Sequence, residues 1–259
     1  MSQHLLEVLE VSKTFTTGFL RARKKICALN RVNFNLERGS ILGIIGESGS
    51  GKTTLARIIL RLIKMDEGKI LLENRDIQDI TRLEYYRRVQ MLFQDPYSSF
   101  NPVFRMEHAF KNAVKILRPI SSKEQKREIL NSLTKVRLSE DILDKYPHEL
   151  SGGQLQRASI ARILLINPEL LIADEPTSMV DASLRITILN IFSRMVRELN
   201  KSIILITHDI SQAFYICDEI IIMQRGRLVE KGPVEKVIFN PQEEYSKKLI
   251  ADVPRLISS

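Results

Sequence analysis

The sequence lacks any segment that would span a membrane. Its longest apolar runs, such as ILGII and IILI, have the length of strands, far short of the roughly 18 consecutive apolar residues that a membrane span needs. The first residues, MSQHLLEVLEV, also lack the basic-then-apolar pattern of a secretory signal. We therefore expect a chain that stays in the cytosol.

Cysteines are scarce as well. Cys27 and Cys217 are the only two, and they lie far apart without a Cys-x-x-Cys spacing, so we expect neither a disulfide nor a metal site between them. The sequence also contains no internal repeat and no low-complexity segment. With 259 residues, 44% of them hydrophobic and 27% charged, the chain is long enough to bury a real core as one domain with a subdomain.

The net charge of +8 could indicate nucleic acid, an anionic membrane surface, or surface solubility alone. Lysines and arginines are scattered, except for RARKK at 21–25. No aromatic residues interleave with that run, as they would on a base-stacking platform. We predict a solvated surface loop there, with a contact to lipid head groups or to a membrane partner as the alternative, and we expect no nucleic-acid partner.

The spacing of apolar residues predicts an α/β fold. LLEVLEV and RVNFNLE alternate apolar and polar residues, which is typical of half-buried antiparallel strands. ILGIIG is continuously apolar, as a strand covered on both faces would be. Helical patterns in KTTLARIILRLI and SLRITILNIFSRMVREL alternate with strand-like runs in LLIADEP, SIILITHD and EIIIMQRG. This alternation predicts βαβ units in a mainly parallel sheet, preceded by an N-terminal antiparallel part; we expect one helix within the first 90 residues.

The stretch between about 95 and 165 has a different pattern, with no strand-like run. FRMEHAFKNAVKIL and SSKEQKREILNSLTKV have helical spacing, and Ser121 with Glu124 fits a capping box at the start of the second. We predict a helical insert at 95–165 within an α/β core formed by 1–94 and 166–240. Residues 241–259 are predicted to form a short helix and a tail.

The stretch GESGSGKTT, residues 46–54, fits the pattern G-x-x-x-x-G-K-[ST] and lies between a buried-strand pattern and a helical one, which is the context that confirms the motif. Its glycines allow positive φ angles, so that the backbone amides can close around phosphate oxygens. A helix that begins near Lys52 would point its positive end at the same anion. The residues that we predict to bind the nucleotide here are Gly46, Glu47, Ser48, Gly49, Ser50, Gly51, Lys52, Thr53 and Thr54.

The stretch LLIADE, residues 170–175, completes this predicted site for Mg-ATP with a strand that ends in two adjacent carboxylates. Lys52 would reach the β- and γ-phosphates, and Thr53 would offer its hydroxyl to Mg²⁺. Asp174 would hold Mg²⁺ through a water molecule. Because successive side chains of a strand alternate between its faces, we expect Glu175 to point elsewhere, where it could polarise the attacking water as a base.

A second glycine loop, LSGGQ at 150–154, occurs together with the phosphate loop and LLIADEP. In this combination the chain resembles the ATP-binding-cassette (ABC) ATPases over essentially its whole length. In that family two cassettes face each other head to tail, and the second loop of one covers the γ-phosphate held by the other.

The residues of the LSGGQ loop suit that task. Ser151 is a natural N-cap with a hydroxyl to spare for phosphate, and Gly152 and Gly153 leave the backbone bare for close approach. The helix that continues through Gln154 would present its N-terminal amides to the anion. The resemblance therefore implies a dimer that encloses two Mg-ATP molecules and reopens after hydrolysis.

Further positions match the family one by one. The resemblance implies that Gln94 contacts Mg²⁺ and water and links the core to the helical insert, and that His208 contacts the γ-phosphate during catalysis. Asp181 would lie in the loop that crosses the dimer interface, where Met179 and Val180 replace the more usual Ala-Leu. Phe15 would stack on adenine, with packing in the strand core as the alternative.

Within the family, the chain is similar to the ATPase subunits of peptide and nickel importers. The similarity lies in QDPYSSFNP at 94–102, in the extra residues 16–26, and in NPQEEYSKKLIADVP near the end. It implies uptake of oligopeptides or dipeptides, with nickel or oligosaccharides as alternatives. Members of this group commonly bind an iron–sulfur cluster through cysteines in the C-terminal tail; this tail has none, so we expect no iron–sulfur cluster.

The resemblance also implies partners and a location. The partners would be a second ABC ATPase, a different chain or a copy of this one, with two integral membrane permease subunits and an extracellular or periplasmic substrate-binding protein. The chain would lie peripherally on the cytoplasmic side of the plasma membrane. A soluble ABC ATPase of nucleic-acid repair or translation is less favoured, since the chain has one phosphate loop and a short insert. A binding module without turnover is disfavoured by Glu175 and His208.

Overall fold

The computed structural model describes residues 4–17, 24–117 and 121–251. The strands are β1 (His4–Thr17), β2 (Lys24–Glu37), β3 (Ile41–Ile45), β4 (Glu67–Leu72), β5 (Arg75–Asp76), β6 (Val89–Leu92), β7 (Leu170–Asp174), β8 (Ser202–Thr207), β9 (Glu219–Gln224) and β10 (Arg227–Pro233). The helices are α1 (Lys52–Ile59), α2 (Arg82–Arg88), α3 (Met106–Leu117), α4 (Ser122–Lys135), α5 (Gly152–Ile166), α6 (Ala182–Leu199), α7 (Ile210–Ile216), α8 (Val234–Phe239) and α9 (Glu244–Ala251).

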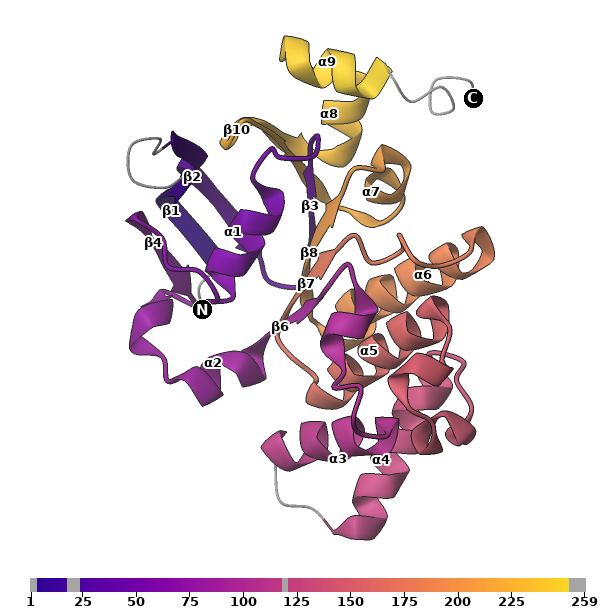
Figure 1. Cartoon of the computed structure of the whole chain (residues 1–259). Coiled ribbons are helices and arrows are strands. Elements are labelled where there is room, and N and C mark those ends of the chain that lie inside the picture. The colour runs from indigo at the N-terminus through magenta and orange to yellow at the C-terminus, as the bar shows by residue number, and fades with distance from the viewer. Residues whose placement is uncertain (1–3, 18–23, 118–120, 252–259) are drawn as a thin grey trace.

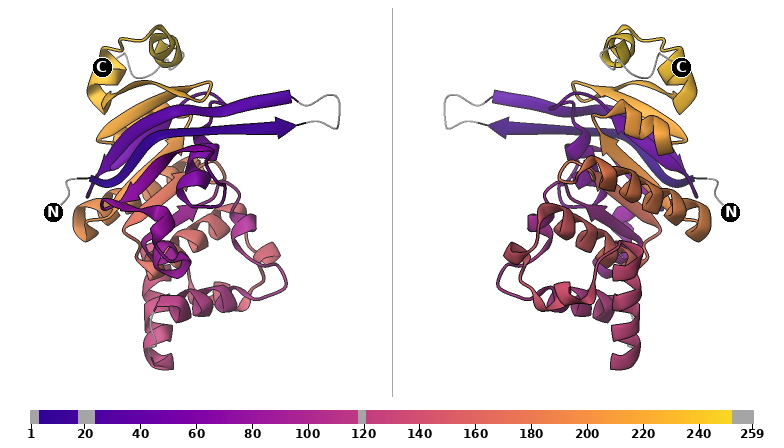
Figure 2. Two further views of the ribbon diagram at one scale, coloured as in Figure 1. Left: turned by 90° about the vertical axis from the view of Figure 1, so that its left-hand side faces the viewer. Right: turned by 90° about the vertical axis from the view of Figure 1, so that its right-hand side faces the viewer.

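The strands form two sheets. The order β2-β1-β4-β5 makes an antiparallel sheet, and the order β10-β9-β3-β8-β7-β6 makes the main sheet. Within the main sheet, β9, β3, β8, β7 and β6 run parallel and β10 pairs antiparallel with β9. The antiparallel pairing of β1 with β2 and the parallel core confirm the predicted α/β organisation. Figure 2 shows the β1–β2 ribbon projecting sideways from the body and the helices α3 and α4 at the lower end.

The central strand β3 is apolar on both faces, and one of these faces packs with helix α1, which lies between the two sheets. All five residues of β3 are buried. Leu42 and Ile44 pack with α1 and the antiparallel sheet. Ile41 and Ile45 face the other cluster, which includes residues of α5 and α6. A continuously apolar strand is therefore explained by alternation toward two separate cores.

The main sheet brings the predicted site residues to one edge. In the parallel register Ile45 pairs with Thr207, and Asp174 pairs with Ile206. The chain therefore leaves β3, β7 and β8 at the same level, and the segments after these three strands meet there. This is the crevice at the carboxyl ends of parallel strands where ligands bind in open α/β sheets.

The expectation of one helix within the first 90 residues was wrong, because α2 follows α1. Thr81 caps α2 by accepting the N–H of Glu84, and Tyr85 is its one buried residue. A helix of 7 residues that buries a single side chain leaves no apolar stripe for sequence analysis to detect. Helix α1 is also shorter than the pattern KTTLARIILRLI, since Arg61 adopts a φ of +59° just beyond it.

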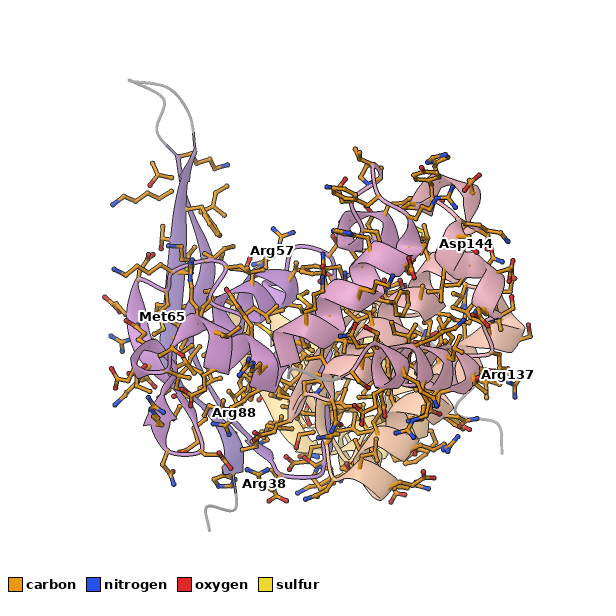
Figure 3. All side chains as sticks on the ribbon, turned by 90° about the horizontal axis from the view of Figure 1, so that it is seen from below. Arg38, Arg57, Met65, Arg88, Arg137 and Asp144 are labelled. Atoms are coloured by element: carbon orange, nitrogen blue, oxygen red, sulfur yellow. The ribbon has the colours of Figure 1, made fainter. Side chains whose placement is uncertain are left out.

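The helical side of the molecule contains α3, α4 and α5. The capping box predicted for Ser121 and Glu124 is present at the start of α4. Seen from below, Met65 and Arg88 lie on the side of the antiparallel sheet, whereas Arg137 and Asp144 lie on the helical side (Figure 3). Arg88, the last residue of α2, joins that helix to the segment just before β7 through a two-pronged ion pair with Glu169, with both N···O distances at 2.8 Å.

Some predictions concern residues outside the described ranges. Residues 18–23, with most of the extra segment 16–26 and of the basic run at 21–25, lie outside them, as do residues 252–259 of the C-terminal tail. Helix α9 is present where a short C-terminal helix was predicted. No helix among residues 4–17, 24–117 and 121–251 has both the length and the apolar character needed to cross a bilayer.

Candidate active site

The phosphate loop, residues 46–54, connects the buried strand β3 to α1. Gly51 has a φ of +108°, and a Cβ atom there would lie 2.5 Å from the carbonyl oxygen of Ala28. Any other residue at this position would therefore be strained and would overlap the backbone of β2. Gly51 is also the N-cap of α1 and supplies no side-chain hydrogen bond, so no cap competes with an anion for the first amides of the helix.

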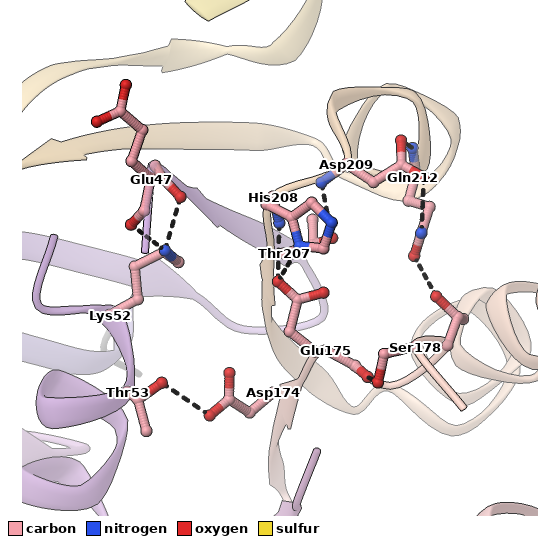
Figure 4. A network of polar contacts seen from close by, with 12 residues as sticks. Glu47, Lys52, Thr53, Asp174, Glu175, Ser178, Thr207, His208, Asp209 and Gln212 are labelled. Carbon is pink, nitrogen blue, oxygen red and sulfur yellow. Dashed lines mark hydrogen bonds and ion pairs between the residues drawn. The ribbon is translucent and has the colours of Figure 1, made fainter. Parts of the chain in front are cut away.

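Lys52 lies beneath this loop and closes it. Its ammonium donates to the carbonyl oxygens of Gly46 at 2.6 Å and Glu47 at 2.8 Å (Figure 4). Burial lowers the pKa of Lys52, although the carboxylates of Glu175 and Asp174 oppose this effect. A cation is therefore held where phosphate oxygens would meet the loop amides.

Asp174 ends β7 directly beside α1. The hydroxyl of Thr53 donates to its Oδ2 at 3.1 Å (Figure 4). Burial raises the pKa of Asp174, while the hydrogen bond from Thr53 acts in the opposite direction. A hydroxyl and a carboxylate with oxygen donors are the kind of ligands that a hard cation such as Mg²⁺ prefers.

Glu175 points away from Asp174, but not for the predicted reason. We expected the alternation of strand side chains to separate them; instead β7 ends at Asp174, and Glu175 has a φ of +47°. Its own N–H donates to the carbonyl of Ile206 at 2.9 Å, which keeps this left-handed residue against β8. The direction of the Glu175 side chain is therefore set by a turn after the strand.

The carboxylate of Glu175 contacts His208 twice. Its Oε1 accepts the backbone N–H of His208 at 3.0 Å and lies 2.7 Å from the ring Nδ1 (Figure 4). The Glu175 side chain is 13% exposed, whereas that of His208 is 73% exposed. The imidazole is thus oriented by a nearly buried carboxylate and presents its other edge to the open side of the site.

These side chains surround one cavity of about 340 Å³. It is lined by Ile26, Cys27, Ala28, Ser48, Gly49, Gly51, Lys52, Thr53, Thr54, Gln94, Asp174, Glu175 and His208. The fold therefore brings five separate stretches of the sequence to one place: β2, the phosphate loop, the segment at Gln94, the end of β7 and the start of the segment after β8.

Residues of β2 were not predicted to contribute to this cavity. Ile26, Cys27 and Ala28 line it because β2 passes over the start of α1, where Gly51 approaches Ala28. The predicted contact of Phe15 with adenine was the one sequence feature that pointed to this part of the molecule. Phe15 pairs with Ile26 across the β1–β2 ribbon, and paired side chains lie on the same face. Phe15 is half-buried and does not line the cavity, so its adenine contact stays a prediction.

The signature loop, residues 150–154, lies apart from this cavity. Ser151 caps α5 by accepting the N–H of Gln154 at 3.2 Å, and Gln154 Oε1 accepts the N–H of Ser151 at 2.9 Å. Gly152 and Gly153 begin the helix and face the segment with Met179 and Val180 at ordinary contact distances. The described chain alone therefore does not bring the signature loop to the phosphate loop.

The segment that contacts the signature loop leads into α6. Asp181 is the N-cap residue of α6 and makes no side-chain capping hydrogen bond. Met179 and Val180 replace the Ala-Leu that is more usual at this position, and they differ in environment: Val180 lies in the core and Met179 at the surface.

A mainly parallel sheet with a glycine-rich phosphate loop between β3 and α1 defines a P-loop nucleoside triphosphatase. The family described as ABC transporter matches residues 29–178. The dipeptide transport ATP-binding protein DppF of Haemophilus influenzae is 35% identical over 97% of this chain and 79% of that protein. The oligopeptide transport ATP-binding protein OppF of Bacillus subtilis is 34% identical over 98% of this chain and 84% of that protein.

Solved structures agree with these sequence relatives. The dimeric ATP-binding cassette MJ0796, in a post-hydrolysis state with ADP and Pi, superposes with a TM-score of 0.79 at 29% identity, over 88% of this chain and 98% of that one. The cassette cbiO1 of Clostridium perfringens, part of the transporter complex cbiONQ, has a TM-score of 0.78 at 29% identity, over 98% and 97%. The chain therefore belongs to the ABC transporter family, as a cassette that binds and hydrolyses ATP.

Proposed function

We propose that this chain is the ATP-binding subunit of an importer that takes up oligopeptides or dipeptides. The support is the 34–35% identity, over nearly the whole chain, to the transport ATP-binding proteins of dipeptide and oligopeptide systems. Two of the three segments that suggested a peptide importer in the sequence are at the start of the helical side (94–102) and in the stretch that includes α9 (240–254). Nickel and oligosaccharides are the alternative cargoes.

In the proposed reaction the phosphate loop holds the nucleotide, and Glu175 is the base that polarises the attacking water. The observation that supports this assignment best is the pair formed by Glu175 and His208, which faces Lys52 across the 340 Å³ cavity. His208 is oriented by that carboxylate and would contact the γ-phosphate. Glu175 then accepts a proton from the water while the charge of Lys52 stabilises the phosphate oxygens.

Thr53 and Gln94 would hold Mg²⁺ directly, and Asp174 would hold it through a water molecule. These three residues line one cavity, and their hydroxyl, amide and carboxylate groups offer oxygen ligands that suit a small hard cation that keeps part of its water shell. When bound, the cation neutralises charge on the β- and γ-phosphates.

We propose that two cassettes enclose two ATP molecules. Ser151 lies exposed at the start of α5, outside the cavity of its own chain, and its hydroxyl hydrogen is free of the capping bond, in which the oxygen accepts. Ser151, Gly152, Gly153 and Gln154 would therefore contact the ATP of a facing cassette, and Asp181 would lie at that interface. Phe15 would stack on adenine beside β2.

The helical side, within residues 95–165, would transmit this closure to the membrane. A mainly apolar groove of about 530 Å³ lies there, lined in part by Phe100, Phe104 and Ala109. Phe100 follows Gln94 by 6 residues, so a shift of Gln94 on binding Mg-ATP would be passed directly to the groove. We propose that a cytoplasmic segment of each permease subunit docks in it, with this chain on the cytoplasmic side of the plasma membrane and a binding protein outside.

The variant Glu175→Gln tests the chemistry. Because the amide cannot accept a proton, ATP hydrolysis should fall about 100- to 10,000-fold, while ATP binding persists and a nucleotide-bound dimer accumulates. Steady-state phosphate release and sedimentation velocity with ATP measure these effects. The control is Glu198→Gln, an exposed residue of α6, which should behave as the unaltered chain does. Retention of more than a tenth of the activity by Glu175→Gln would place the base elsewhere.

The same variant, tagged in its native cells, tests the partners. Gentle solubilisation in the presence of ATP should recover a trapped assembly of two permease subunits and a second cassette chain, identified by mass spectrometry. Recovery of ribosomes, DNA or soluble proteins alone would leave the ATPase chemistry in place and reject the importer.

A further inference from the structure

Helix α9 lies against the phosphate loop, although the two are at opposite ends of the sequence. The hydroxyl of Tyr245 in α9 accepts the backbone N–H of Glu47 at 3.3 Å. Figure 1 shows α8 and α9 at the same end of the molecule as the turn from β3 to α1. None of the roles assigned so far uses this contact.

Helix α9 is itself firmly attached to the core. Tyr245 and Leu249 pack against the main hydrophobic cluster, and Ile250 is buried within it. Just before the helix, the N–H groups of Gln242 and Glu243 donate to the carboxylate of Glu230 at 2.9 and 3.3 Å. Burial alone would raise the pKa of Glu230, but the hydrogen bonds that it accepts hold this pKa below its usual value. The Tyr245 hydroxyl is therefore presented by a fixed element.

The phosphate loop is well held at Gly46 and in its second half, where it meets neighbouring backbone, and has fewer contacts with the rest of the chain from Glu47 to Gly49. The N–H of Gly226 donates to the carbonyl of Ser50 at 2.9 Å, and Gly51 abuts the backbone of β2. By contrast, a Cβ atom at Gly49 would have no neighbour within 4 Å. Among the described residues, Tyr245 supplies the one hydrogen bond that joins Glu47, Ser48 or Gly49 to a residue outside the loop.

Open space lies on both sides of this part of the loop. One side faces the 340 Å³ cavity of the active site. The other faces a cavity of about 650 Å³ between the loop and α9, which is lined by Glu47, Ser48, Gly49, Ser50, Gln224, Arg225, Glu244, Tyr245 and Lys248. The loop therefore has room to move on either side, and the contact at Tyr245 ties its Glu47 end to α9.

We propose that Tyr245 is a positioning residue for the phosphate loop: its hydroxyl holds the Glu47 end of the loop in the conformation that receives ATP before ATP arrives. This inference rests on the proposed role of the loop as the ATP site. Tyr245 does not line the active-site cavity, so its effect passes through the backbone of Glu47, whose carbonyl accepts from Lys52.

This role predicts a specific kinetic pattern. Without the hydroxyl, the free loop spends less time in the competent conformation, and the apparent affinity for ATP falls in proportion. Once ATP is bound, its phosphates hold the loop through many contacts, so the turnover of the saturated enzyme should not change. A neutral hydrogen bond of this kind corresponds to a change of about two- to tenfold.

The test is Tyr245→Phe in the full chain, which removes the hydroxyl and keeps the ring packed against the core. The KM for ATP should rise about two- to tenfold with kcat unchanged. The Kd for ATP, measured by calorimetry in the Glu175→Gln background, should rise equally. Hydrogen exchange of residues 46–51 should become faster in the absence of nucleotide. The matched control is Tyr215→Phe, which removes a hydroxyl that bonds Asn190 at 3.0 Å, away from the loop.

A second variant removes the anchor of α9. Glu230→Gln replaces one of the two acceptor oxygens that hold Gln242 and Glu243, and it should also raise the KM. If α9 acts through the Tyr245 hydroxyl, the double variant should have the KM of Tyr245→Phe alone.

Three outcomes would overturn the inference. The first is a KM and an exchange rate for Tyr245→Phe equal to those of Tyr215→Phe, and the second is a lower kcat at unchanged KM. The third is a failure of the unaltered chain itself to bind ATP, which would reject the proposed function together with this inference. A chain that binds ATP but ignores Tyr245 rejects the inference alone.

Discussion

Two glycine-rich loops begin helices in this molecule, and their glycines serve different purposes. In the phosphate loop, Gly51 has a φ of +108° and a Cβ atom there would lie 2.5 Å from the backbone of β2. In the signature loop, Gly152 and Gly153 are helical, and a Cβ atom on either would meet no atom closer than 3.6 Å. The fold of this chain therefore requires the first glycine and does not require the other two.

The helices that follow the two loops, α1 and α5, also differ in how their first turns are capped. Helix α1 begins at Gly51 without a side-chain cap, so its first amides are available to an anion. Helix α5 begins with a complete capping box between Ser151 and Gln154. The first N–H groups of α1 therefore depend on a ligand of the phosphate loop for a partner, whereas the start of α5 is capped by residues of the signature loop itself. We infer that the bare backbone at Gly152 serves an approach from outside the chain, by the nucleotide of a facing cassette.

The largest expected effect is that of Gly51→Ala. The strained φ costs about 1–3 kcal/mol, and the overlap with Ala28 adds about as much again. Because both act on the loop that must close around phosphate, the Kd for ATP should rise about 100-fold or more. Calorimetry with ATP in the Glu175→Gln background measures it. An unchanged affinity for ATP in Gly51→Ala would show that the phosphate loop does not need this glycine. The difference between the glycines of the two loops would then be wrong.

Gly152→Ala should have a smaller and more selective effect. The free chain should be as stable as the unaltered one within about 0.5 kcal/mol, since alanine fits the space and favours the helix. Its affinity for ATP as a single chain should not change. The ATP-driven dimer should weaken about tenfold, because a methyl group in a close contact costs about 1–3 kcal/mol.

Sedimentation velocity of Glu175→Gln chains, with and without the additional Gly152→Ala change, measures the affinity of the dimer separately from the ATP affinity of the single chain. A dimer of undiminished affinity would mean that nothing approaches Gly152 closely, and the difference between the two loops would need another explanation. A loss of ATP affinity in the single chain would mean that the two loops act within one chain.

The sequence predicts those parts of the fold and of the site that depend on patterns within continuous segments of the chain. The buried strands and long helices were predictable because their apolar residues repeat along continuous segments. That Gln94, Asp174, Glu175 and His208 lie around one cavity follows from a parallel sheet, in which strand ends share an edge. Their individual roles stay predictions from the family resemblance.

The features that escaped prediction depend on contacts rather than on periodicity. Helix α2 buries one side chain, so nothing in its sequence marks a face. The orientation of Glu175 depends on a left-handed backbone after β7, which a strand pattern cannot indicate. The bond from Glu47 to Tyr245 joins residues 198 positions apart. Only the packed structure places these groups together.

Of the three changes in the two glycine loops, Ser151→Ala should have the smallest effect, which falls on the stability of the free chain. The Ser151 hydroxyl satisfies the N–H of Gln154, and loss of such a cap typically costs about 1 kcal/mol of unfolding free energy. Urea unfolding measures this, with Ser122→Ala at the exposed first residue of α4 as a control that removes a serine beside a cap and not the cap itself. No equivalent loss can occur at α1, whose N-cap is a glycine without a side chain. If Ser151→Ala is as stable as Ser122→Ala, then α5 also depends on an external partner to complete its start, and the two glycine loops are more alike than their geometry indicates.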